Sequence, residues 1–493
     1  MPIFRFGLPG LFAASLLALA PAACTDEPEG SPRVVVIGGK PALADPAAGP
    51  LKAPDAVLLQ NVAQGLVAFD SSGDIVAGLA ERWNVSNDGL SYIFRIAPAT
   101  WPNGSKITAE QVARALRRQI MTGSRNPLSD ALGAVSEVVP MTDRVIEIRL
   151  ANPRPNLLAL LAQPEMAMVR GGVGSGPFTL AGKAPQGADR LLVRELEDLE
   201  GGTASEERVL LSGHSAEQAI ADFAGGKSDL VLGGTFADLP LARKVTRPRD
   251  ALRFDPVSGL FGLAPVRRDS HFASAEWRRL LSEAIDRDAL LAALAVPGLS
   301  SRATLFVAGL DGVAAPAPPE WMARPLAERH PQLVARARNL IEGTDQEVLR
   351  LWLPKGHGGD LLLRRLEVDW SALGLTVERA ATRPAADFEL IDEVAPSASP
   401  AWFARRFRCG IAAVCDPEVD QLLAAARDAV VPDQRYALLT QAAARIDEDA
   451  LFLSIAAPIR WSLVGNRVKT FSGNRFARHT LVGLDREPAG LER

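Results

Sequence analysis

Strand and helix patterns alternate along the chain, and one strand–helix–strand unit limits the folds that it can adopt. Residues 347–353 and 375–380 have the pattern of strands, and residues 360–373 between them have that of a helix. Two strands joined by a helix at this spacing predict a right-handed parallel crossover. Because strand-rich and helix-rich stretches also interleave elsewhere, the sequence predicts a mixed α/β protein.

Capping boxes and periodic apolar residues locate further elements. Thr108 and Ser215 each begin a capping box, and Ser274 is placed to cap one long helix over 276–294. Residues 451–464 are predicted to form strand pieces broken at Pro458. The other expected elements are strands at 33–38, 90–96, 145–150 and 229–232, a hairpin at 66–77, and helices at 416–429 and 432–450.

The size and charge of the chain limit its class. Its 493 residues are enough for two or three lobes of about 100–200 residues each. A net charge of −4 provides no basic field, so nucleic acid is not an expected partner. The chain has 5 histidines, and none has another at metal-ligand spacing, so no metal site is expected.

Two glycine-containing stretches resemble nucleotide-binding motifs but lack required residues. Gly226-Lys227-Ser228 resembles the end of a phosphate-binding loop, yet Ala221 stands where that loop needs a glycine. In the stretch 172–177, Pro177 stands where a dinucleotide fingerprint needs its last glycine. We therefore expect no cofactor and no bound ATP.

The first 23 residues have the order of a secretory signal. Arg5 precedes an apolar stretch over 7–20, and the small residues Ala22 and Ala23 follow it. This stretch is too short to span a bilayer as an anchor, so the mature protein is expected outside the cytoplasm, in the periplasm or another extracytoplasmic space.

Cys24 follows the signal and leaves two readings open. It is either a lipidated N-terminal residue or a residue near an ordinary cleavage site. A bacterial lipobox usually has leucine three residues before the cysteine, and this chain has Pro21 there. The polar tether over 24–32 favours lipidation, which would be the only membrane contact. The two remaining cysteines, Cys409 and Cys415, are close enough in sequence to form a disulfide in an oxidising compartment.

A series of short motifs follows one another in order from the N-terminal to the C-terminal part of the chain. They lie at 61–67, 78–83, 87–96, 101–104, 107–112, 174–178, 219–232, 278–290, 417–423 and 435–446. Together they resemble the peptide/nickel-type solute-binding proteins of ABC importers, which are family 5, cluster C.

This resemblance implies a three-lobed periplasmic-binding-protein fold with two large lobes, a hinge and a small inserted lobe. Lobe I would consist of 33–52, 175–262 and 456–493, the small lobe of 53–174, and lobe II of 263–455. In such proteins the ligand is enclosed between the two large lobes, and its affinity depends on the free energy of closing.

One departure from the family pattern bears on the ligand. Peptide-binding relatives usually carry an aromatic–acidic–Asp-Pro stretch before the final helix pair, whose carboxylate can pair with the amino group of a peptide. Here Ser399 stands in place of that acid, and Arg405 follows it. Two interpretations remain: the ligand is neutral or acidic, or another acid replaces the missing one in space.

The candidate ligand-binding residues lie mostly in this stretch. Trp402 and Phe403 are the candidate ligand-facing aromatics, with core packing as the alternative. The polar candidates Ser399, Arg405 and Asp392 lie near them, and Gly176 belongs to the turn that resembles the family's entry into the central sheet. A Cys409–Cys415 disulfide would fix the loop that carries Trp402.

The sequence therefore predicts a monomeric extracytoplasmic protein that captures a peptide or peptide-like solute and delivers it to the permease and ATPase of an ABC importer. One alternative is a protein of the same fold that binds a non-peptide ligand or acts as a sensor or cell-wall factor. A secreted hydrolase is the second alternative. It would need a Ser/His/Asp set or a carboxylate pair in a cleft, and the few histidines argue against an enzyme.

Overall fold

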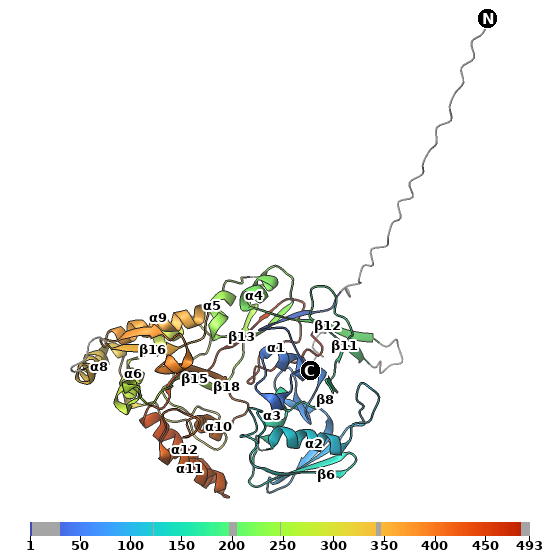
Figure 1. Ribbon diagram of the computed structural model, residues 1–493, viewed down its shortest axis with the longest axis horizontal. Coiled ribbons are helices and arrows are strands. Elements are labelled where there is room, and N and C mark those ends of the chain that lie inside the picture. The colour runs from blue at the N-terminus through green and yellow to red at the C-terminus, as the bar shows by residue number, and fades with distance from the viewer. Residues whose placement is uncertain (2–29, 122, 197–204, 247, 342–346, 485–493) are drawn as a thin grey trace, which may run out of the picture.

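The computed structural model describes residues 1, 30–121, 123–196, 205–246, 248–341 and 347–484 (Figure 1). The apolar stretch of the expected signal and Cys24 lie outside the described residues. Three β-sheets with their covering helices form three lobes, two large and one small. Within the described residues, no helix combines the length and the apolar character needed to cross a membrane.

Lobe I is built on a seven-stranded sheet in the order β10-β11-β12-β1-β13-β20-β14. The central strand β1 is parallel to β12 and β13, and its Val34, Val35 and Val36 are all buried because helices cover both faces. The strands are β1 Arg33–Ile37, β10 Thr179–Leu180, β11 Arg190–Leu196, β12 Ser205–His214, β13 Leu230–Thr235, β14 Leu252–Phe254 and β20 Arg460–Val464.

The helices of lobe I are α1 Ala53–Val62, α4 Ala216–Ala224 and α5 Leu239–Ala242. As its capping box predicts, Ser215 caps α4 by accepting a hydrogen bond from the backbone N–H of Gln218. Leu58 and Val62 of α1 pack into the same core as β1. The structure thus places α1 against lobe I, although the expected division had put residue 53 onward in the small lobe.

The small lobe is a four-stranded antiparallel sheet in the order β4-β5-β7-β6. In β5 the side chains of Tyr92, Phe94 and Ile96 are buried while Ile93 is exposed, which is the period-two pattern of a sheet with one covered face. Its elements are β2 Val67–Phe69, β3 Ile75–Ala77, β4 Ala80–Val85, β5 Ser91–Ile96, α2 Ala109–Ile120, β6 Val135–Thr142, β7 Val145–Leu150, α3 Leu157–Leu161, β8 Val169–Arg170 and β9 Val173–Gly174.

Lobe II has a five-stranded sheet in the order β17-β16-β18-β15-β19. The strands β16 and β17 are parallel and joined by α9, which confirms the predicted crossover. The elements are β15 Gly259–Pro265, α6 Ala275–Ala284, α7 Arg287–Leu294, α8 Leu326–Ile341, β16 Val348–Trp352, α9 His357–Ser371, β17 Thr376–Arg379, β18 Phe388–Val394, α10 Pro400–Arg405, α11 Pro417–Asp428, α12 Pro432–Glu448 and β19 Leu453–Ala456.

Short 3-10 helices complete the described chain. They are η1 Pro46–Ala48, η2 Pro164–Met166, η3 Phe236–Asp238, η4 His271–Ala273, η5 Glu320–Ala323 and η6 Arg383–Ala385.

The prediction of one helix over 276–294 was wrong, because the helix is interrupted between α6 and α7. Asp286 caps α7 by accepting a hydrogen bond from the N–H of Ala289, and its own N–H donates to the carboxylate of Asp369 at 3.0 Å. A capping aspartate has non-helical backbone angles, so the helix must restart at this point.

The chain passes between the two large lobes twice. It leaves lobe I after β14 and enters β15, and it returns between β19 and β20, where Pro458 lies. The expected divisions at 262/263 and 455/456 fall inside β15 and β19. Arg460 of β20 donates to the Asp392 carboxylate at 2.8 Å and to the Asp392 carbonyl at 3.0 Å, so an ion pair joins the two sheets beside these crossings.

Arg287 joins several elements of the lobe II core. It is buried, and its guanidinium donates to the carbonyl oxygens of Ser282 at 2.7 Å, Ser454 at 2.8 Å and Arg302 at 2.9 Å. Removal from water lowers its pKa to about 9, so the group is still charged at neutral pH and needs these acceptors.

We predict that Arg287→Met lowers the free energy of unfolding by at least about 3 kcal/mol, because buried carbonyl oxygens lose their donors. The matched control is Arg364→Met, which removes an exposed arginine from α9 and should change stability by no more than about 0.5 kcal/mol. Urea unfolding of both variants measures the difference. Equal effects would contradict a structural role for the Arg287 hydrogen bonds.

Candidate functional site

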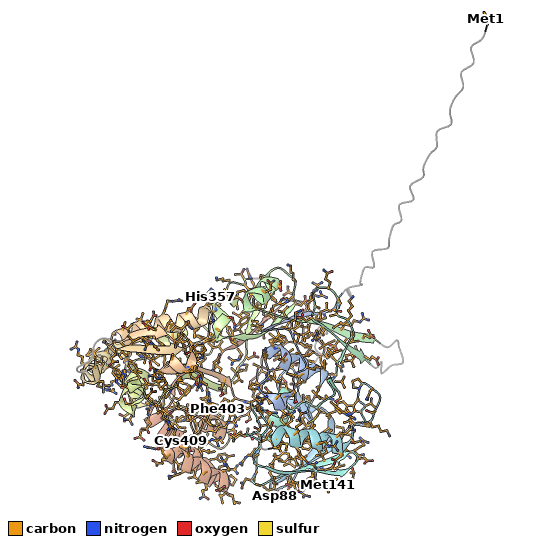
Figure 2. All side chains as sticks on the ribbon, in the orientation of Figure 1. Met1, Asp88, Met141, His357, Phe403 and Cys409 are labelled. Carbon is orange, nitrogen blue, oxygen red and sulfur yellow. A yellow bond between two sulfur atoms is a disulfide. The ribbon has the colours of Figure 1, made fainter. Side chains whose placement is uncertain are left out.

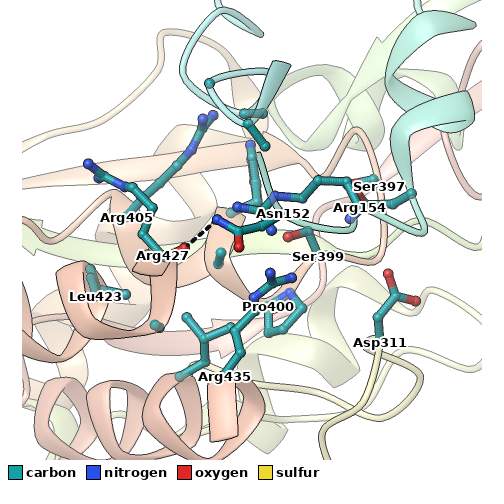
Figure 3. Close-up of a pocket in the computed structure, with 18 of the residues that line it drawn as sticks. Asn152, Arg154, Asp311, Ser397, Ser399, Pro400, Arg405, Leu423, Arg427 and Arg435 are labelled. Carbon is teal, nitrogen blue, oxygen red and sulfur yellow. Dashed lines mark hydrogen bonds between the residues drawn. The ribbon is translucent and has the colours of Figure 1, made fainter. Parts of the chain in front are cut away.

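A cavity of about 360 Å³ lies between the small lobe and lobe II (Figure 3). The small lobe contributes residues near 130–134 and 151–156, and lobe II contributes the segment 397–408 together with parts of α11 and α12. A volume of this size is at the low end of the range of about 300–1,000 Å³ found for small-molecule sites. The resemblance implies a ligand site between the two large lobes. The residues that line this cavity come instead from the small lobe and lobe II.

Three of the predicted ligand-binding residues line this cavity together. Ser399, Trp402 and Arg405 face it from the start and the body of α10. Pro400 occupies the first helical position, where proline is tolerated, so the helix begins directly after Ser399. The Ser399 side chain makes no capping hydrogen bond, which leaves its hydroxyl available at the wall.

The structure places the other three candidates elsewhere. Phe403, which Figure 2 labels, is fully buried. Its ring packs against Trp402 at 5.0 Å between centroids and against Phe306 at 6.5 Å. Asp392 is held in the ion pair with Arg460 described above. Gly176 donates to the carbonyl of Val62 at 3.0 Å, and a Cβ at Gly176 would lie 2.5 Å from the Val62 carbonyl carbon, so this glycine allows two backbones to approach closely.

Two guanidinium groups that the sequence did not single out meet in the cavity wall. Nη1 of Arg154 donates to the carbonyl oxygen of Pro153 at 3.0 Å, and Nη1 of Arg435 donates to the same oxygen at 2.9 Å. Arg154 belongs to the small lobe and Arg435 to α12 of lobe II. The sequence signal was slight, because Arg435 only begins one of the family-like motifs and Arg154 lies outside all of them.

An acid near Ser399 was also missed. The backbone N–H of Asp311 donates to the carbonyl of Ala398 at 2.9 Å, which places Asp311 beside the segment where the family's acid is absent. Its neighbour Gly312 has a φ of +66°, and a Cβ there would lie 2.0 Å from the Tyr436 ring. Glycine is therefore required for the turn that carries Asp311 to the wall. Figure 3 shows the Asp311 carboxylate far from Arg405 across the pocket.

A second cluster of charges connects the lobes at the edge of the cavity. Asp130 of the small lobe forms ion pairs with Arg405 at 3.0 Å and Arg408 at 3.4 Å of lobe II. Two amide side chains add neutral contacts between the lobes: Asn152 donates to the Arg427 carbonyl and Gln163 to the Pro396 carbonyl, both at 3.0 Å.

Burial changes the pKa values of the charged groups in the wall. It lowers the pKa of Arg154 to about 10, with the nearby positive charge of Arg435 as the second cause. Burial also lowers the pKa of Arg435 and of Arg405, although the Asp130 carboxylate partly offsets this for Arg405. For Asp311, burial raises the pKa, and Arg475 acts in the opposite direction. The cavity thus contains charges that have lost part of their contact with water.

A disulfide joins Cys409 and Cys415, whose Cα atoms are 5.2 Å apart. It closes the loop between α10 and α11, and the N–H of Cys409 donates to the Asp420 carboxylate at 3.0 Å. Arg408 directly precedes this loop. That the disulfide fixes the segment carrying Trp402 stays a prediction.

The fold and cavity can now be compared with known proteins. The sequence pattern of the family described as Bacterial extracellular solute-binding proteins, family 5 Middle, matches residues 74–343, more than half of the chain. The chain belongs to this family of solute-binding proteins. Its expected extracytoplasmic location agrees with this membership, while lipidation of Cys24 stays a prediction. The match is to binding proteins and not to enzymes, as the sequence predicts.

Relatives and solved structures of this family extend over nearly the whole chain. A probable di/tripeptide-binding protein 5 of Pseudomonas aeruginosa is 24% identical over 475 residues, covering 84% of this chain and 88% of that protein. The Escherichia coli murein tripeptide binding protein MppA has a TM-score of 0.75 at 18% identity, covering 92% of this chain and 97% of that one. The Haemophilus influenzae OppA complex with RPPGFSPFR has a TM-score of 0.73 at 16% identity, covering 91% and 97%. These likenesses establish the periplasmic-binding-protein fold.

The ion pairs of Asp130 give this family member a testable lobe contact. We predict that Asp130→Asn raises the open population of the ligand-free protein several-fold, because each exposed pair is worth about 0–1 kcal/mol and this variant weakens two. Spin labels at the exposed positions Met141 and Val430 would report the distance between the lobes.

The matched control is Glu137→Gln, which removes a carboxylate that pairs with Arg149 inside the small lobe. It should leave the distance distribution unchanged. An unchanged distribution in Asp130→Asn as well would show that the Asp130 pairs do not hold the lobes together.

Proposed function

We propose that this solute-binding protein captures a peptide of two or three residues, or a molecule of similar size, and delivers it to the permease and ATPase of an ABC importer. The main support is the cavity of about 360 Å³ between the small lobe and lobe II, whose wall carries opposite charges at separate places. A free small peptide also has opposite charges at its two ends. The di/tripeptide and murein tripeptide specificities named for two similar proteins favour the same size class.

Asp311 is the residue that we propose to bind the amino group of the peptide. In the sequence, Ser399 stands where peptide-binding relatives have an acid. Asp311 takes over the role of that acid in our proposal, because its backbone is hydrogen-bonded to the neighbouring Ala398. Its carboxylate forms no ion pair within the part of the chain that the structure describes, although Arg475 is near enough to act on it electrostatically. A protonated amine would supply the missing partner for a partly buried carboxylate.

We predict that free di- and tripeptides raise the melting temperature of the protein and that Asp311→Asn weakens their binding roughly tenfold or more, because a charged hydrogen bond is lost. N-acetylated peptides should bind weakly to the unsubstituted protein and be insensitive to the substitution. Calorimetric titration measures both. Asp433→Asn, on the exposed first turn of α12, is the control and should retain full affinity.

The pH dependence of binding adds a separate readout. Asp311 must be ionised to pair with an amine, and burial raises its pKa. Affinity for free peptides should therefore fall on acidification at a higher pH than an ordinary aspartate would give. Equal binding of free and acetylated peptides at all pH values would exclude Asp311 as the amine site.

Delivery to an importer is tested in cells. We predict that deletion of this chain abolishes ATP-dependent uptake of the peptides that stabilise the purified protein, and that the intact chain restores it. Uptake that continues at the same rate without the chain would favour a sensor or cell-wall role over transport.

A further inference from the structure

The cavity wall holds two guanidinium groups that converge on one oxygen atom. Arg154 and Arg435 both donate to the carbonyl oxygen of Pro153 (Figure 3). The two guanidinium groups are therefore separated by no more than the length of two hydrogen bonds. Like charges at this separation repel each other, and partial burial strengthens the repulsion. Holding such a pair together costs free energy unless a negative charge offsets the repulsion.

The described part of the chain provides no acid for this pair. Neither guanidinium forms an ion pair with a described carboxylate, in contrast to Arg405 and Arg408, which share Asp130. Three buried polar atoms of the wall also lack a hydrogen-bond partner among the described residues: Nε of Arg408, Nε of Arg435 and Oγ of Ser397. Arg435 and Ser397 are only 8% and 4% exposed, so an unpaired donor is costly at each.

The charges of the wall do not balance. Its partly or fully buried arginines number four, whereas Asp311 is its one partly buried acid among the described residues, because Asp130 is exposed at the cavity edge. At the rim, the exposed Arg427 and Asp428 offset each other. The four arginines are Arg154, Arg405, Arg408 and Arg435.

The geometry points to a solute of net negative charge, in which a carboxylate bridges Arg154 and Arg435. This inference rests on the proposed capture of a small peptide and narrows it to acidic peptides or peptide-like acids, which carry more carboxylates than amino groups. A carboxylate matches the planar fork of a guanidinium and can accept from two of them at once. Its oxygens would also accept from the Ser397 hydroxyl or from the unpaired Arg435 Nε–H.

The test uses three pools of dipeptides, each of alanine with one other residue type, titrated into the full-length mature protein. The acidic pool contains Glu or Asp, the amide pool contains their isosteres Gln or Asn, and the basic pool contains Lys or Arg. We expect the acidic pool to bind at least ten times more tightly than the amide pool, and the basic pool to bind most weakly. Arg154→Gln should reduce the acid-over-amide preference to less than threefold, whereas the exposed control Arg364→Gln retains it.

Arg154→Gln is preferred to the loss of Arg435, because Arg435 is buried and its loss could unfold α12. Arg435→Lys serves as the second variant and should weaken the acid-over-amide preference while keeping the charge.

Equal binding of acidic and amide pools, or an unchanged preference in Arg154→Gln, would overturn the inference and leave peptide capture standing. If no pool binds, peptide capture fails, and succinate, glutarate and citrate decide the inference. Stabilisation of the unsubstituted protein but not of Arg154→Gln by these acids would support it, and no stabilisation would overturn it.

Discussion

The carbonyl oxygen of Pro153 accepts hydrogen bonds from guanidinium groups of two different lobes, and the arrangement of the cavity depends on this contact. Pro153 and Arg154 belong to the small lobe, whereas Arg435 extends from α12 of lobe II. The contact therefore exists only while the lobes are together. It brings a partly buried positive charge from the small lobe and a buried one from lobe II to the same point in the cavity wall. A neutral carbonyl satisfies hydrogen-bonding geometry but cannot neutralise two charges. With the two lobes together, the positive charges of Arg154 and Arg435 are therefore not neutralised by the described residues, and an anionic solute could neutralise them.

The lobes differ in how they hold their buried charges. Inside lobe II, Arg287 finds backbone carbonyl acceptors from its own lobe, and Asp369 accepts from both Arg365 and the N–H of Asp286. Arg287 thus donates only to acceptors of its own lobe and needs no ligand, whereas Nε of Arg365 in the same lobe has no partner among the described residues. Between the lobes, by contrast, Arg435 retains an unpaired Nε–H. Satisfied networks stabilise a rigid body, whereas unsatisfied ones at a cleft mark the place where a partner is missing. The same residue type thus contributes to stability in one place and to recognition in the other.

Much of the architecture could be predicted because its causes are local in sequence. The capping boxes at Thr108 and Ser215 and the strand–helix–strand spacing each depend on a few adjacent residues, and the structure has those elements. The interruption after Ala284 was missed, although the capping residue Asp286 is local in sequence; its N–H also donates to Asp369, which is far away in sequence. The segment around α10 was identified as part of the site because it departs from a family pattern at Ser399.

No local pattern indicates Asp311. Its position depends on the turn at Gly312, which packs against the ring of Tyr436 in the distant helix α12. Site residues contributed by separate lobes meet only after folding, so a single sequence cannot reveal their pairing.

Charge in the cavity couples binding to closure. If the small lobe and lobe II separate, Arg435 moves away from Arg154, so both groups regain water and their repulsion falls. Closing without a solute must therefore overcome both repulsion and desolvation, which the ion pairs of Asp130 offset only in part because that carboxylate is largely exposed. An anionic solute removes the repulsion in the closed form and gains little from either arginine alone in the open form. Its differential affinity for the two forms is what shifts the equilibrium towards closure. A neutral solute of the same size would fill the volume without offsetting the charge, so selectivity and closure in this protein follow from the same pair of arginines.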